Sequence, residues 1–263
     1  MAHEEWVVRM ATDALHSPKY KHICPDTLQA MAMQEVQRGH GHYREAENAY
    51  RKRLHQLWGS YVDGRYAQKA SAMLEAATCN HDHILALHAS SRERLPYYKA
   101  FYNAVWDATG TPETLLDVAC GLNPFALPYM SVQPQRYIAL DVDGQAAMLC
   151  NRWFAMQGLP QLARCDDALV RPLKDIADVA LVLKLLPLLE YQVQDGPAHL
   201  LSALQARYVV VSYPLQSLGG RHKGQRSHYE EMMTRHLVGF PMVWQGVIGN
   251  ELVAIIRKEE TNA

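Results

Sequence analysis

The apolar positions in the first hundred residues follow the spacing of helices, and no strand pattern is visible among them. Pro25 and Asp26 mark a helix start, because proline fits the first helical turn and an acidic side chain is favoured there. Apolar residues at helical spacing continue over 48–62, 84–95 and 97–108, and Pro96 is expected to start the last of these helices. The sequence therefore predicts an all-helical N-terminal domain.

After Gly110 the pattern changes to short apolar runs that alternate with turns and helical segments. The runs cover residues 115–120, 137–142, 179–183, 208–212 and 252–256. This alternation indicates a mainly parallel sheet with helices on both faces, which binds its ligand at the carboxyl ends of the strands. We expect an α/β, Rossmann-like domain over 106–263, preceded by the helical domain over 1–105.

The composition is that of a soluble globular protein, with 49% hydrophobic and 20% charged residues among 263. The most apolar stretch, residues 179–189, contains Lys184 and Pro187 and is too short to span a membrane. The N-terminus lacks the apolar segment of a signal peptide. These features predict a cytoplasmic protein with no membrane partner. The five cysteines form no CxxC pair, so neither a disulfide framework nor a metal site is indicated.

The net charge of −1 would by itself argue against a nucleic-acid partner. The charge is nevertheless unevenly distributed along the chain. Residues 1–105 carry 13 basic and 11 acidic side chains and nine of the 13 histidines, whereas 106–263 carry 13 basic and 16 acidic ones. A basic surface, if present, must therefore be local.

Acidic residues follow successive predicted strands. The first run ends in DVACG at 117–121, where Ala119 and Gly121 let the backbone approach a ligand closely. Asp141 ends the second run and could accept hydrogen bonds from ribose hydroxyls, and Asp166 and Asp167 lie where a third strand should end. Each carboxylate alone is more often a turn residue. Together, and without a GxGxxG motif, they predict a nucleoside cosubstrate that lacks a diphosphate.

Four motifs carry a family resemblance: HASSRER at 88–94, DVACGLNP at 117–124, KLLPLLE at 184–190 and SLGGRHKG at 217–224. In this order they resemble the aminoglycoside-resistance 16S rRNA (guanine-N7) methyltransferases, and the resemblance extends from about residue 17 to the C-terminus. It implies S-adenosylmethionine as cosubstrate and 16S rRNA within the 30S subunit as partner. It also implies methylation of a decoding-site guanine and resistance to 4,6-disubstituted deoxystreptamines such as gentamicin and kanamycin.

The resemblance also implies which residues form the cosubstrate pocket. Arg94 is expected to pair with the methionine carboxylate, because its planar guanidinium can bind a carboxylate in two places. The complete predicted set, with Gly121 added from the strand-end turn, is Tyr61, His88, Ala89, Ser90, Arg94, Ala119, Gly121, Asp141, Asp166, Asp167, Leu183 and Gln192.

Lys184 is the candidate catalytic residue, since it matches a lysine that the family needs for activity. Guanine N7 already has a free lone pair, so the transfer needs no general base. Holding the reactants in line can contribute about 7–11 kcal/mol, enough to dominate catalysis. We expect Lys184 to hold a phosphate or guanine O6. The alternative is a structural lysine whose stem covers apolar surface.

The expected rRNA contacts are basic residues from two parts of the chain, although an ordinary solvated surface would have the same composition. The residues are Lys19, Lys21, Arg51, Lys52, Arg53, Arg221, Lys223 and Arg226.

We expect a monomer that binds no metal. Three alternatives stay open: a methyltransferase of another rRNA base or a small molecule, a nicotinamide oxidoreductase, and a non-catalytic RNA-binding module.

Overall fold

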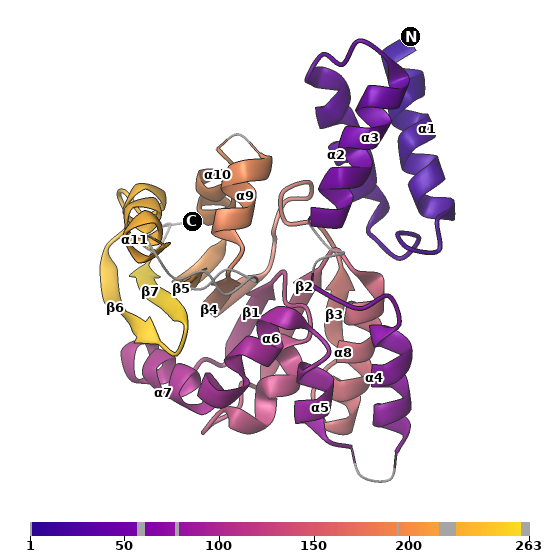
Figure 1. Ribbon diagram of the computed structural model, residues 1–263. Helices are drawn as coiled ribbons and strands as arrows, with labels where there is room; N and C mark the ends of the chain where they lie inside the picture. Colours follow the sequence, from indigo (N-terminus) through magenta and orange to yellow (C-terminus); the bar gives the residue numbers. More distant parts are fainter. Residues whose placement is uncertain (1, 57–60, 77–78, 194, 216–224, 259–263) are drawn as a thin grey trace.

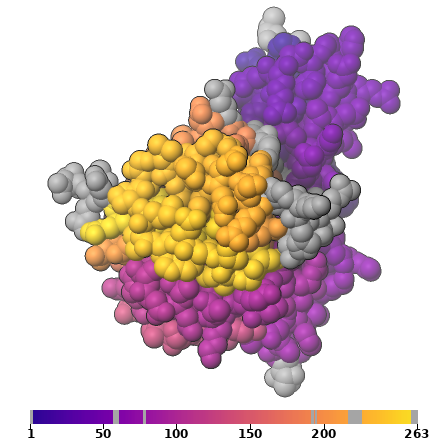
Figure 2. Space-filling view, turned by 60° about the vertical axis from the view of Figure 1, so that its left-hand side comes forward, coloured from indigo at the N-terminus to yellow at the C-terminus, as the bar shows by residue number. Residues whose placement is uncertain are grey.

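The computed structural model describes residues 2–56, 61–76, 79–193, 195–215 and 225–258 (Figure 1). Helices α1 (Ala2–His16), α2 (Pro25–Gln37) and α3 (Tyr43–Leu54) pack together as a lobe that stands out from the rest of the molecule (Figures 1 and 2). Its interior includes Met10, Leu28 and Tyr50, which are almost fully buried. The predicted start of α2 at Pro25 is confirmed. We call α1–α3 the helical lobe.

The helix predicted over 48–62 is wrong at its C-terminal end. α3 begins at Tyr43 and ends at Leu54, and Leu57 and Trp58 lie outside the described residues. Where the description resumes, Tyr61 lies in a turn: its carbonyl accepts a hydrogen bond from the Ala89 amide at 2.9 Å. A long-range backbone contact here overrides the local helical pattern.

Further helices follow the helical lobe and pack around the sheet and the helices that cover it (Figure 1). The segment predicted as helical over 84–95 is divided by a break at 86–88. Pro96 lies in a short 3₁₀ helix directly before α7, in agreement with its expected role at a helix start. The domain boundary predicted at 105 falls inside α7. The bounds are α4 (Tyr66–Glu75), α5 (His81–Leu85), α6 (Ala89–Arg94), η2 (Leu95–Tyr97) and α7 (Tyr98–Thr109).

Seven strands of the described chain form one sheet in the order β3-β2-β1-β4-β5-β7-β6. β1 to β5 run parallel, whereas β7 is antiparallel to both β5 and β6. Each of the five predicted apolar runs coincides with a strand, although the first extends two residues past the end of its strand and the second one residue, and the strand expected before Asp166 is also present. The bounds are β1 (Thr114–Val118), β2 (Arg136–Asp141), β3 (Leu162–Cys165), β4 (Ile176–Leu183), β5 (Gln205–Pro214), β6 (Met242–Ile248) and β7 (Glu251–Arg257).

Sequence reasoning did not predict β6, which forms an edge of the sheet. Its side chains alternate between exposed and half-buried positions, so it has no continuous apolar run. By contrast, β4 and β7 lie inside the sheet and are buried over most of their length, which explains their uninterrupted apolar character.

Alternate strand residues contribute to two cores on opposite faces of the sheet. Leu115 and Val179 pack on the side of α7, η3 (Asn123–Tyr129) and α8 (Gly144–Met156). Leu116 and Ala180 pack on the side of α9 (Leu186–Gln192), α10 (Gly196–Ala203) and α11 (Gln225–His236). Each fully buried leucine or valine side chain stabilises the fold by roughly 1.5–3 kcal/mol. The Rossmann-like fold expected from the sequence is therefore confirmed.

The strand order reverses beside β1, because β2 and β3 lie on one side of it and β4 and β5 on the other. A ligand crevice is expected at the carboxyl ends of the strands at this point. The helical lobe approaches the same edge: the Cys24 amide donates to the Val142 carbonyl at 2.7 Å, directly after β2. Within the described residues, no helix combines the length and apolar character needed to cross a membrane.

Candidate functional site

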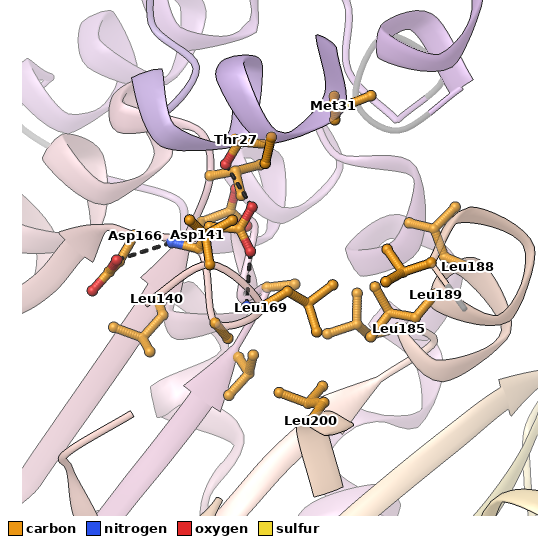
Figure 3. A pocket seen from close by; sticks show the side chains of 18 of the residues that line it. Thr27, Met31, Leu140, Asp141, Asp166, Leu169, Leu185, Leu188, Leu189 and Leu200 are labelled. Atoms are coloured by element: carbon orange, nitrogen blue, oxygen red, sulfur yellow. Dashed lines mark hydrogen bonds between the residues drawn. The ribbon is translucent and has the colours of Figure 1, made fainter. Parts of the chain in front are cut away.

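A pocket opens at the carboxyl ends of β1, β2 and β4 (Figure 3). Most of the predicted cosubstrate residues meet there, although they come from segments far apart in the sequence. Of the predicted set, the pocket is lined by Tyr61, His88, Ser90, Ala119, Asp141, Asp166, Asp167, Leu183 and Lys184. Ala89, Arg94 and Gly121 are outside this lining, and the side chain of Gln192 lies outside the described residues.

In the turn after β1, the backbone at residues 119–121 lies close to the pocket. Ala119 has φ +55° and Gly121 has φ +51°, a region that side chains larger than hydrogen disfavour. A Cβ at position 121 would lie 3.0 Å from Nε2 of His88. The glycine at 121 is thus favoured both by its backbone conformation and by the close approach of the histidine.

Asp141 ends β2, and backbone amides hold its carboxylate in place. Oδ2 accepts from the Gly121 amide at 2.7 Å and Oδ1 from the Asp143 amide at 2.8 Å. Burial, followed by the neighbouring charge of Asp143, raises the pKa of Asp141 to about 7. Each carboxylate oxygen has a second lone pair, so Asp141 can still accept hydrogen bonds from hydroxyl groups in the pocket.

Asp166 and Asp167 begin a loop over residues 166–171 that follows β3. The Asp166 amide donates to the Asp141 carbonyl at 2.9 Å, which joins the ends of β2 and β3. Asp167 accepts from the Thr27 hydroxyl at 2.7 Å and from the Leu169 amide at 2.9 Å. Both Asp167 oxygens therefore already bind the protein, and its predicted contact with the cosubstrate stays a prediction.

Tyr61 and His88 form one aromatic wall of the pocket. Their rings stack with centroids 5.8 Å apart and planes at 11°. Burial, together with the positive charges of Arg94 and Lys184, lowers the pKa of His88 to about 4. Nδ1 of His88 is buried and has no hydrogen-bond partner within the described part of the chain. Because buried polar atoms are nearly always hydrogen-bonded, this neutral imidazole fits a polar group in the pocket.

Lys184 lies directly after β4 in a left-handed conformation with φ +58°. Its amide donates to the carbonyl and hydroxyl oxygens of Ser212, at 3.0 and 3.1 Å. Its ammonium group lies 2.8 Å from Oε2 of Glu93 and 3.3 Å from Oε1 of Glu251. The lysine is therefore fixed at both ends by the protein.

Arg94 forms a two-point ion pair with the same Glu251. Nε donates to Oε1 at 2.9 Å and Nη2 to Oε2 at 2.8 Å, and both side chains are almost fully buried. Burial alone would raise the pKa of Glu251, but the charges of Arg94 and Lys184 hold it below its ordinary value. The carboxylate that Arg94 binds in this structure belongs to the protein, and its pairing with a methionine carboxylate stays a prediction.

The sequence does not predict several residues of the site, which come from both the sheet domain and the helical lobe. Glu251 precedes the last apolar run, and its only signal was an acidic residue at the start of a buried strand. Glu93 lies inside the HASSRER motif, but the motif by itself predicts no role for it. Thr27, Met31 and Gln34 from α2 line the pocket, and nothing in their helical pattern indicated this.

Arg53 is predicted with Arg51 and Lys52 as an rRNA contact at the surface, and the expected surface position is wrong, because Arg53 is buried. It is only 7% exposed, donates to Glu35 at 2.7 Å and Gln34 at 2.8 Å, and contributes to the pocket lining. It is buried because the fully buried carboxylate of Glu35 requires a cationic partner.

The other predicted rRNA contacts that the structure describes are exposed, namely Lys19, Lys21, Arg51, Lys52 and Arg226. Two of them form ion pairs along their own helices, Arg51 with Glu47 at 2.7 Å and Arg226 with Glu230 at 2.8 Å. Arg221 and Lys223, with the rest of 216–224, lie outside the described residues.

The mainly parallel sheet, its switch-point pocket and the strand-end carboxylates define a Rossmann-like methyltransferase fold. The sequence matches the model of the family described as ribosomal RNA methyltransferase (FmrO) over residues 16–253. The chain belongs to this family.

Individual relatives agree with the family match. Proteins named 16S rRNA (guanine(1405)-N(7))-methyltransferase from Frankia casuarinae and Serratia marcescens are 32% and 33% identical to this chain. The alignments cover 97% and 94% of this chain and 95% and 96% of those proteins. The crystal structure of the 16S rRNA methyltransferase RmtF in complex with S-adenosyl-L-homocysteine is similar with a TM-score of 0.86 and 31% identity. That match covers 97% of this chain and 99% of the other. The 16S rRNA methylase RmtB gives a TM-score of 0.83 and 30% identity, covering 96% and 98%.

Proposed function

We propose that this protein transfers a methyl group from S-adenosylmethionine to N7 of a guanine in the decoding site of 16S rRNA. We further propose that the substrate is the assembled 30S subunit in the cytoplasm and that the monomer is active. The observation that carries the proposal is the pocket, where the strand-end residues predicted for a nucleoside meet. The chain is also similar over nearly its full length to proteins named for this reaction.

The pocket residues fit a nucleoside that carries an amino-acid tail. Asp141 offers a carboxylate to ribose hydroxyls, and the turn at Ala119 and Gly121 admits a ligand next to the backbone. His88 contributes a buried nitrogen without a partner within the described residues. S-adenosylmethionine, when bound, supplies an electrophilic methyl group.

The charged cluster beside the pocket favours a positioning role for Lys184. Lys184 and Arg94 are balanced by Glu93 and Glu251, so the cluster has no net charge. A neutral cluster avoids placing an unbalanced cation next to a sulfonium or next to guanine that becomes positive at N7. Because its ammonium already binds carboxylates, Lys184 is better suited to fix the end of β4 than to hold a phosphate.

Catalysis then consists mainly of alignment. The lone pair of N7 points along the major-groove edge, so no protein group has to remove a proton before attack. The chain's contribution is to hold both reactants in line and to exclude water, which can supply about 7–11 kcal/mol. A guanine within folded rRNA must first be unstacked to enter such a pocket.

The test is to locate the methylated nucleotide. Purified 30S subunits are incubated with the protein and S-adenosylmethionine, treated with borohydride and aniline, and analysed by primer extension. We expect one cleavage at a decoding-site guanine and none without the methyl donor. Methyl incorporation without that cleavage would instead indicate another base, and no incorporation into subunits would favour a small-molecule substrate.

A further inference from the structure

The helical lobe forms one wall of the cosubstrate pocket. Thr27, Met31 and Gln34 of α2 and Arg53 of α3 line it together with the strand ends. Figure 3 shows Thr27 and Met31 on the helix side of the pocket, with Leu185 and Leu200 from the sheet domain on the opposite side. A lobe that served only to bind RNA would not need to contribute to this cavity.

The contacts between the lobe and the sheet domain concentrate on two segments that border the pocket. Near the end of β2, the Gly144 amide donates to the His22 carbonyl at 2.9 Å, next to the contact between Cys24 and Val142. In the 166–171 loop, Arg171 donates to Asp26 at 2.6 Å. The segment from His22 to the first turn of α2 therefore contacts both segments that carry predicted cosubstrate carboxylates.

The hydrogen bond from Thr27 to Asp167 is the central contact of this junction. The two oxygens are 2.7 Å apart, and Thr27 is only 4% exposed. Hydrogen bonds to ionised groups are stronger than neutral ones, and the first turn of a helix favours a nearby carboxylate. Because Asp167 also accepts from the Leu169 amide, Thr27 fixes the conformation of the loop as well as its distance from α2.

We propose that α2 is part of the cosubstrate site, with Thr27 as a positioning residue that holds the 166–171 loop against the bound nucleoside. This inference rests on the proposed function, since it takes S-adenosylmethionine as the ligand. Cosubstrate binding and docking of the helical lobe then stabilise each other, because coupling between two sites is reciprocal. The loaded enzyme thus presents the exposed cations of α3 in a fixed position relative to its active site.

The first test compares Thr27→Val with Thr12→Val, an exposed control on α1 in the same lobe. Calorimetry with S-adenosylhomocysteine should give at least about fivefold weaker binding for Thr27→Val and unchanged binding for Thr12→Val. Equal binding by wild type and Thr27→Val overturns this inference alone. A wild-type protein that does not bind S-adenosylhomocysteine overturns the proposed function with it.

A second test does not depend on the affinity of a variant. Cys24 is 2% exposed at the junction and contacts Cys165 at the end of β3, so its alkylation reports undocking of the lobe. Saturating S-adenosylhomocysteine should slow N-ethylmaleimide labelling of Cys24, measured by mass spectrometry, by about fivefold or more in wild type. Labelling of Cys79, which is partly exposed and remote from the junction in sequence, serves as the control. If the ligand leaves the Cys24 rate unchanged, lobe docking and cosubstrate binding are not coupled.

Discussion

Asp141 is the residue whose ionisation links pH most directly to the proposed cosubstrate binding. Its pKa is raised to about 7 by burial and by Asp143, so the ligand-free protein carries a proton there in acidic solution. A ligand that needs the carboxylate as an acceptor must displace this proton, and its affinity therefore falls as the pH drops below about 7.

We predict that affinity for S-adenosylhomocysteine falls about tenfold between pH 8 and pH 6. His88, with a pKa of about 4, stays neutral across this range and does not contribute. Asp141→Asn should bind weakly and without this pH dependence, because an amide does not titrate. Calorimetry at several pH values measures both effects, and a flat wild-type profile would contradict the assignment of Asp141.

Glu251 is the residue on which the buried charge cluster depends. It binds Arg94 in two places and lies 3.3 Å from the Lys184 ammonium. Removing one partner of a buried ion pair leaves the other charge without compensation, which costs about 3–5 kcal/mol.

We predict that Glu251→Gln lowers the free energy of unfolding by about 3–5 kcal/mol in urea denaturation. The matched control is Glu230→Gln, which removes a more exposed carboxylate paired with Arg226 and should change stability by less than about 1 kcal/mol. Equal effects of the two variants would show that the cluster does not depend on Glu251.

At the scale of elements, α3 carries exposed and buried cationic side chains at consecutive positions. Arg51 and Lys52 are exposed, whereas Arg53 is directed into the lobe and pairs with Glu35. The same basic run can therefore serve two purposes, rRNA contact on one side of the helix and lobe stability on the other.

We predict that Arg51→Glu combined with Lys52→Glu weakens binding to 30S subunits and reduces its salt dependence, because fewer phosphates are neutralised. Affinity for S-adenosylhomocysteine should be unchanged, since neither residue lines the pocket. Filter binding at several salt concentrations tests this, and an unchanged salt slope would remove this face from the rRNA contact.

Arg53→Ala should act differently, through stability. It removes one cation from the buried Glu35, while Arg38 and His40 remain at 3.0 and 3.1 Å. We expect a loss near the lower end of the roughly 3–5 kcal/mol range for broken buried ion pairs, measured by urea denaturation. Unaltered stability would show that the buried Glu35 does not depend on Arg53.

At the scale of the whole molecule, the proposed function predicts a drug-resistance phenotype. Methylation of N7 removes an acceptor and leaves a positive charge where gentamicin and kanamycin present ammonium groups. A like-charge contact near 4 Å costs about 1–4 kcal/mol, and a lost charge-assisted hydrogen bond about 1.5–3 kcal/mol more. Together these terms reduce drug affinity by two or more decades.

We expect cells that express the protein to grow in gentamicin and kanamycin but to remain sensitive to streptomycin, which binds elsewhere. Asp141→Ala, expressed at the same level, should restore sensitivity. Minimum inhibitory concentrations provide the measurement. Resistance that persists in the Asp141→Ala strain would mean that methylation in this pocket is not its cause.

The sequence by itself determined six of the seven strands in the described chain and the positions of the strand-end residues. Parallel strands buried on both faces need continuous apolar runs, and their carboxyl ends meet at one edge, so Asp141 and Asp166 could be placed from spacing alone. The small residues at 119 and 121 could be read in the same way, because left-handed backbone restricts which side chains are tolerated.

Only the tertiary structure decided which charges are buried and how the helical lobe meets the sheet domain. The partnership of Glu251 with Arg94 spans 157 positions, and that of Thr27 with Asp167 spans 140. A local pattern gives no information on such pairs: the helical period marks which residues share a face of α2 or α3, but not what that face will contact. Arg53 shows the consequence, since its burial depends on a carboxylate from a neighbouring helix and not on the basic run in which it stands.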